Sequence, residues 1–122
     1  MTELPPIGGP MIVQLLETIP LMLGDEKLLQ AETATRLDSA GINYRREVRL
    51  SEHDIIDFMI EGGVAIEMKI KGGRHAIYRQ CERYCMFDAV RTLVLATNVA
   101  MSLPAMINGK PTHVASLGRG WL

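Results

Sequence analysis

The order of helical and strand-like patterns along the sequence predicts an α/β domain, a mixed sheet flanked by helices. A helical pattern at 26–40 precedes three strand-like runs, and a second helical pattern then leads into a continuous apolar run at 92–97. An apolar strand that follows a helix is typical of a buried, parallel position in a sheet. The predicted element order is therefore αβββαβ.

Length and composition allow one compact domain. The chain has 122 residues, of which 48% are hydrophobic and 22% charged, so it can bury a core. Residues 1–24 contain four of the six prolines. We therefore expect them to form an N-terminal arm, either mobile or in contact with an oligomer partner, followed by a single domain at 25–122.

The N-terminal region carries no targeting or membrane signal that we recognise. Its apolar run at 11–16 is followed by Glu17 and Pro20 and is too short to span a bilayer. We expect a cytoplasmic protein with no membrane contact, of bacterial or phage origin. In that compartment Cys81 and Cys85, the only cysteines, are expected to be reduced core thiols.

The first helix has clear limits. Asp25 is a good N-cap, Gly41 is a good stop, and Leu29, Thr33 and Leu37 share the side that should face the sheet. The other elements are expected at 44–50, 55–60, 64–70, 75–89 (helix) and 92–97, with a further edge strand at 112–117.

The two runs at 55–60 and 64–70 form a hairpin whose register matters most. A three-residue loop pairs Ile60 with Val64, which places Asp57 directly across from Glu67. The same register pairs Phe58 with Ile66 and Ile56 with Met68 on one apolar face.

Two opposed carboxylates repel each other across a hairpin, and Lys69 lies on the same face as Glu67. In one interpretation the two carboxylates lie on a solvated hairpin face and Lys69 compensates their charge. In the other they form an oxygen cage for Mg²⁺ or Mn²⁺, and Lys69 lies beside the attacking water. The hairpin alone leaves both readings open.

The stretch IIDFMIEGGVAIEMKIKGG resembles the core hairpin of the PD-(D/E)XK nucleases, in which an Asp and a Glu-x-Lys sit on adjacent strands. Upstream, Glu26 and Gln30 are similar to the family's Glu-x-x-x-Gln arrangement. Downstream, Gln80 and Tyr84 are similar to the Gln-x-x-x-Tyr motif of RecB-type nucleases. The resemblance covers about residues 25–98 and implies a restriction-endonuclease-like core. The family's leading Pro-Asp is Ile56-Asp57 here.

The resemblance also implies roles for single residues. Asp57 and Glu67 would bind Mg²⁺ or Mn²⁺, helped by the backbone carbonyl of Ile66 or Ala65, and Lys69 would orient the water and offset charge in the transition state. Glu26 is preferred to Glu32 as a further catalytic and metal-binding carboxylate, because Glu32 projects about 120° away from it around the helix.

The second helix carries the remaining predicted site residues. Gln80 is expected to steady a catalytic carboxylate or the nucleic-acid backbone, although a polar neighbour of a partly buried Tyr84 is an equal alternative. Residues 69–91 hold six cations and two anions, a net +4, whereas residues 1–44 hold two cations and six anions, a net −4. The residues expected to bind nucleic acid are Arg45, Arg46, Lys71, Arg79, Arg83 and Tyr84.

The sequence thus predicts a metal-dependent nuclease that hydrolyses DNA, with a structure-selective endonuclease for junctions or nicking as an attractive subtype. A domain of this size offers little surface for a duplex, so we expect a homodimer or a larger protein partner. The alternative is a non-catalytic nucleic-acid-binding module that keeps the nuclease fold.

Overall fold

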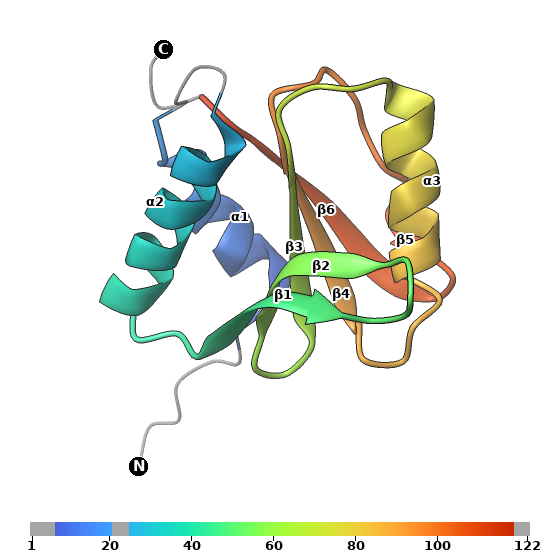
Figure 1. Ribbon diagram of the computed structural model, residues 1–122, viewed down its shortest axis with the longest axis horizontal. Helices are drawn as coiled ribbons and strands as arrows, with labels where there is room; N and C mark the ends of the chain where they lie inside the picture. Colours follow the sequence, from blue (N-terminus) through green and yellow to red (C-terminus); the bar gives the residue numbers. More distant parts are fainter. Residues whose placement is uncertain (1–6, 21–24, 119–122) are drawn as a thin grey trace.

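The computed structural model describes residues 7–20 and 25–118, which form a central sheet between two layers of helices (Figure 1). The elements are α1 (Gly9–Glu17), α2 (Glu26–Ser39), β1 (Tyr44–Arg49), β2 (Ile55–Ile60), β3 (Val64–Lys69), α3 (Arg74–Tyr84), β4 (Thr92–Thr97), β5 (Met106–Ile107) and β6 (Lys110–Ser116). The sheet has the order β1-β2-β3-β4-β6-β5 and is mixed. The predicted α/β class is confirmed.

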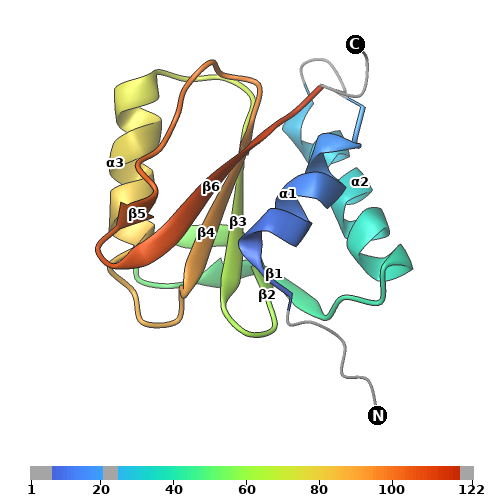
Figure 2. The same ribbon diagram turned by 180° about the vertical axis from the view of Figure 1, so that it is seen from behind.

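Helices cover both faces of the sheet. Helices α1 and α2 pack on one face and α3 on the other, as the two opposite views show (Figures 1 and 2). Strands β3, β4 and β6 run parallel, and α3 is the crossover between β3 and β4. The predicted parallel position of residues 92–97 is therefore confirmed.

Helix α2 begins and ends as its sequence predicts. The carboxylate of Asp25 accepts a hydrogen bond from the Leu28 N–H at 3.1 Å, and Gly41 follows the helix with a φ of +70°. Leu29, Thr33 and Leu37 are buried against the sheet.

The N-terminal region is not an arm where the structure describes it, so that prediction is wrong for residues 7–20. Ile12 and Leu16 of α1 are fully buried in the core, and Pro10 lies in the first turn, where a helix tolerates proline. A Cβ at Gly9 would overlap the imidazole of His113, so glycine lets α1 approach β6 closely. Residues 1–6 and 21–24 lie outside the described residues.

Two other boundaries differ from expectation. Helix α3 ends at Tyr84 rather than near residue 89, and in the loop that follows it the Lys110 ammonium donates to the carbonyls of Phe87 and Val90. The predicted strand at 112–117 is present as β6, but it lies between β4 and the two-residue β5. No helix in the described part of the chain is long and apolar enough to cross a membrane.

Candidate active site

The hairpin of β2 and β3 has the predicted register up to the point where the site begins. Phe58 pairs with Ile66 and Ile60 with Val64, and the loop between them uses positive φ angles at Gly62 and Gly63. The paired ladder ends at Phe58, so the predicted Asp57–Glu67 and Ile56–Met68 pairs do not form.

In both strands of the β1–β2 ribbon, side chains that alternation would place on one face of the sheet lie on opposite faces before and after the position of Asp57. Arg46 and Phe58 lie on the α2 side, whereas Val48 and Ile56 pack in the core on the α3 side. Between them, Glu47 has a φ of 52°, a left-handed conformation that costs a non-glycine residue about 1–2 kcal/mol. The expected single apolar face is therefore wrong for Ile56, because the ribbon twists away from β3 at this position.

The separation of β2 and β3 is bridged by the two predicted carboxylates. The Met68 N–H donates to Asp57 Oδ2 at 2.8 Å, and the Asp57 N–H donates to Glu67 Oε1 at 3.4 Å. Side chains thus replace the missing ladder bonds between the strands. This replacement holds the two carboxyl groups next to each other.

Glu67 is an ionisable group in an apolar place. Its exposed fraction is 3%, and burial first, then the negative charge of Asp57, raises its pKa to about 8. Lys69 opposes this shift, because its Nζ lies 3.3 Å from Glu67 Oε2. Burial also raises the pKa of the half-buried Asp57 carboxyl. The two acids therefore carry less than two negative charges at neutral pH unless a cation joins them.

Tyr84 connects α3 to this pair. Its hydroxyl lies 3.1 Å from Glu67 Oε2 and 3.1 Å from the Ile55 carbonyl, and it accepts a hydrogen bond from Gln80 Nε2 at 2.7 Å. One hydroxyl hydrogen can serve only one of the two acceptors at a time. Gln80 is therefore connected to Glu67 through the Tyr84 hydroxyl and does not contact the carboxyl itself in the hydrogen bonds described.

The role expected for Tyr84 in binding nucleic acid is wrong. Its side chain is fully buried, and its hydroxyl is turned inward to Glu67 and Ile55. The i, i+4 spacing of Gln80 and Tyr84 is a helical signal that the sequence displays. The partner of Tyr84, Glu67, is 17 residues earlier in the chain and could not be found from that spacing.

The helical carboxylate closer to the pair is Glu26. Its negative charge contributes to the raised pKa of Asp57, whereas Glu32 makes an ion pair with Arg36 at 3.0 Å. Within residues 7–20 and 25–118, however, no three or more His, Cys, Asp and Glu side chains gather as a metal-binding group. Ile66 is paired with Phe58 and with Val94, so its backbone lies inside the sheet. The structure brings together Asp57 and Glu67 of the predicted ligands.

This pair of donors fits a hard divalent cation. Mg²⁺ and Mn²⁺ prefer carboxylate oxygens, and in proteins they commonly keep several waters and use only one or two carboxylates. Two adjacent, desolvated acids gain from a cation that replaces the proton they otherwise retain. The raised pKa of Glu67 reflects burial first and the negative charge of Asp57 second, and a bound cation would offset the second of these.

The predicted nucleic-acid-binding cations are divided among different surroundings. Arg83 donates to Asp54 Oδ1 at 3.1 Å and ties α3 to the β1–β2 turn. Arg46 lies 5.2 Å from the Phe58 ring centroid on the α2 side and donates to Gln30 at 3.3 Å. Arg45 faces the other side of the ribbon. Lys71 and Arg79 are exposed.

Asp54 is the residue near the site that sequence reasoning missed. Its carboxylate is 7% exposed and accepts from the Ser51 hydroxyl as well as from Arg83. The Ser51-x-x-Asp54 spacing is the only sequence signal for this turn.

No protein family, curated protein or solved structure matches this chain.

Proposed function

We propose that this protein is a metal-dependent nuclease that hydrolyses phosphodiester bonds in DNA, built on a restriction-endonuclease-like core. One observation carries the proposal: Asp57, Glu67 and Lys69 lie side by side where β2 and β3 separate, with Glu67 buried and Lys69 within 3.3 Å of it. The sequence resemblance to the PD-(D/E)XK nucleases concerns these same three residues.

Asp57 and Glu67 would hold Mg²⁺ or Mn²⁺. When bound, such an ion supplies Lewis-acid stabilisation of the charge on the phosphate. The Gln80–Tyr84 hydrogen bond keeps the Glu67 carboxyl turned toward Asp57 and Lys69. Each chain would supply one such site. A duplex or branched substrate would therefore be bound together with a second copy of the chain or another protein partner.

Lys69 has a different task from the two acids. One side of its ammonium contacts Glu67, and its side chain is 27% exposed, so its remaining N–H groups are open to water and substrate. It can hold the attacking water by hydrogen bonding and offset the negative charge that develops on the phosphate. In the hydrolysis the water oxygen forms a P–O bond and gives up one proton, the ester P–O bond breaks, and the departing oxygen takes up one proton.

The test is cleavage of supercoiled, linear, single-stranded and branched DNA in Mg²⁺, Mn²⁺ or EDTA. We expect cleavage that requires the metal and is lost in Asp57→Asn, while Glu52→Gln, which changes an exposed acid on the β1–β2 turn, cleaves as the parent does. A thermal melt supplies a second readout, because a ligand that binds only the folded state raises the melting temperature. DNA binding without cleavage in either metal would instead identify a non-catalytic binding module.

A further inference from the structure

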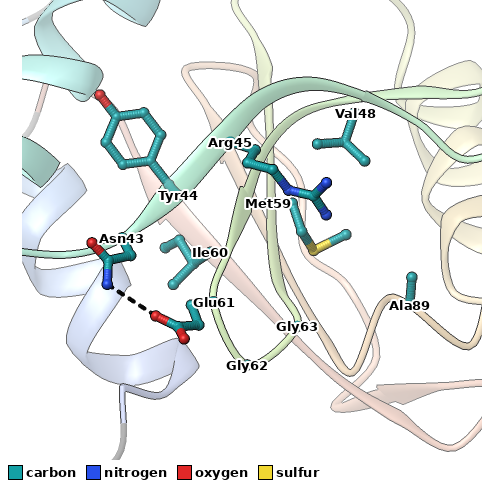
Figure 3. Close-up of a pocket in the computed structure, with 10 residues that line it drawn as sticks. All are labelled: Asn43, Tyr44, Arg45, Val48, Met59, Ile60, Glu61, Gly62, Gly63 and Ala89. Carbon is teal, nitrogen blue, oxygen red and sulfur yellow. Dashed lines mark hydrogen bonds between the residues drawn. The ribbon is translucent and has the colours of Figure 1, made fainter.

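A concave surface lies on the β1–β2 ribbon. It is a cavity of about 460 Å³ on the α3 side of the sheet, between the ribbon and the loop that follows α3. Arg45, Val48, Met59 and Ala89 line it, with Glu61 at the hairpin end (Figure 3). This volume is within the range of small-molecule sites, which run from about 300 to 1,000 Å³.

The walls of this cavity combine an apolar floor with one cation. Arg45 and Met59 are cross-strand partners, so their side chains leave the same face of the ribbon. Figure 3 shows the Arg45 guanidinium directed over Met59 toward Val48, while the Tyr44 ring points the opposite way. Met59 is nearly buried and packs with Val48 in the α3-side core. A flat ligand could therefore lie between an apolar surface and a planar guanidinium.

The cavity and the proposed active site lie along the same strand, β2. Val48 pairs with Ile56, the residue before Asp57, and Met59 is two residues beyond Asp57. Two residues of strand span about 7 Å. A substrate strand cleaved beside Asp57 thus places its neighbouring nucleotide over Met59 and Arg45.

The lining favours a base over a phosphate. It combines one cation, Arg45, with one carboxylate, Glu61, which accepts a hydrogen bond from Asn43 at 3.0 Å at the hairpin end. These two side chains leave no excess positive charge to hold a phosphate. A neutral base, in contrast, can stack on the guanidinium plane.

We propose that this cavity, the Arg45 pocket, binds an unpaired base of the substrate strand next to the scissile phosphate. The inference rests on the proposed nuclease function and deepens it. A base inside a duplex is stacked and paired and cannot enter such a pocket without leaving the helix. The preferred substrate is therefore DNA with a single-stranded segment beside the cleavage point, rather than a continuous duplex.

Binding in EDTA tests the pocket without requiring cleavage. The probes are a short fluorescent single strand without self-complementarity and the same strand annealed to its complement, followed by fluorescence anisotropy. Arg45→Ala removes the cation, and Ala89→Phe fills the cavity from an exposed position without changing charge. Lys27→Ala removes the same charge from an exposed position on α2 and is the control.

We expect Arg45→Ala and Ala89→Phe each to weaken single-strand binding roughly tenfold, the scale of losing one stacked base. Their duplex affinity should match that of Lys27→Ala, and thermal melts should show that all three variants fold. Single-strand affinities equal to the control, or equal losses for single strand and duplex, would overturn the pocket assignment.

Cleavage in Mg²⁺ separates this inference from the proposed function. If the parent cleaves DNA and Arg45→Ala keeps the parent's ratio of single-strand to duplex cleavage, the pocket assignment fails while the nuclease proposal stands. If the parent cleaves no DNA but binds single strands through Arg45 and Ala89, the nuclease proposal fails and the base-binding pocket stands.

Discussion

The two faces of the central sheet bury different chemistry. The face toward α1 and α2 is an apolar core in which Phe58, Ile66 and Met68 pack against the helices. Its buried polar side chain on α2, Thr33, donates to the Leu29 carbonyl within its own helix. The face toward α3 also has an apolar core, but it contains Glu67 and the Tyr84 hydroxyl as well.

The comparison teaches that stability explains the apolar core of each face but does not explain the buried Glu67 on the α3 face. Burying an acid costs free energy, and replacing buried ionic groups by apolar residues is often neutral or stabilising. Ionisable groups with strongly shifted pKa values that share a small region are typical of functional sites. Both faces therefore hold the fold together through apolar cores, and the α3 face also carries the chemistry that we propose.

The largest expected effect is on the α1–α2 face. Phe58→Ala should lower the free energy of unfolding by about 3–5 kcal/mol, because it leaves a cavity in a fully buried core. Urea unfolding followed by circular dichroism measures this loss. A loss below that of Tyr84→Phe, which removes only a hydroxyl on the other face, would break the distinction between the faces.

The next effect concerns activity on the α3 face. Lys69→Ala should lower the single-turnover rate of DNA cleavage in Mg²⁺ by about 10²- to 10³-fold, the usual loss for one preorganised electrostatic group. Its fold should remain, since Lys69 lies at the edge of the core and Glu67 can keep its proton. Lys27→Ala is the control. A folded Lys69→Ala protein with near-parental activity would remove Lys69 from the mechanism.

A pH dependence sharpens the comparison further. The pKa of Glu67 is raised from 4.5 to about 8 in the folded protein, so folding retains a proton that the unfolded chain releases. In metal-free buffer, stability should be highest below about pH 4.5 as far as this group is concerned, and should fall as pH rises toward 8.

Glu67→Gln should abolish that part of the slope, because glutamine mimics the neutral acid and does not titrate. Urea midpoints measured across this pH interval give the slope for both proteins. Mn²⁺ should reduce the slope of the parent, since the ion takes the place of the proton. Equal slopes for parent and variant without metal would show that Glu67 is not held protonated.

The smallest effect separates two neighbouring arginines. Arg79 is exposed, and Arg79→Ala should reduce the salt slope of DNA binding by about one if it contacts a phosphate. Arg83→Ala should change this slope less, because Arg83 is engaged with Asp54 at 3.1 Å. Affinity titrations at several salt concentrations decide between them, and equal slopes for all three proteins would place α3 away from the nucleic-acid backbone.

Local patterns predicted much of the fold. The cap at Asp25, the stop at Gly41 and the stripe of Leu29, Thr33 and Leu37 placed α2 correctly, since helix ends and amphipathic faces depend on near neighbours. Helix α1 was not predicted, because the four prolines of residues 1–24 indicated an arm. Pro10 lies in the first turn, where a proline keeps a helix intact, and Ile12 and Leu16 enter the core.

The candidate site was predicted in part. The hairpin register placed Asp57, Glu67 and Lys69 near one another, because strand pairing and alternation follow from a three-residue loop. The division of the arginines was not predicted. Adjacent residues of a strand point to opposite faces, but only the packing of α2 on one face shows that Arg46 is used there and that Arg45 is left to the other.

The sequence by itself therefore determined the α/β class, most of the helices and strands, and the closeness of two acids and a lysine. The tertiary structure alone decided that the side chains of the β1–β2 ribbon change sides of the sheet near Glu47 and Asp57. It also decided that the Met68 N–H donates to the Asp57 carboxylate and that the Tyr84 hydroxyl donates to the buried Glu67. The physical reason is the distance along the chain over which each interaction acts. Periodicity and turns act between residues close in the chain, whereas burial, and with it the raised pKa of Glu67, depends on which distant elements pack together.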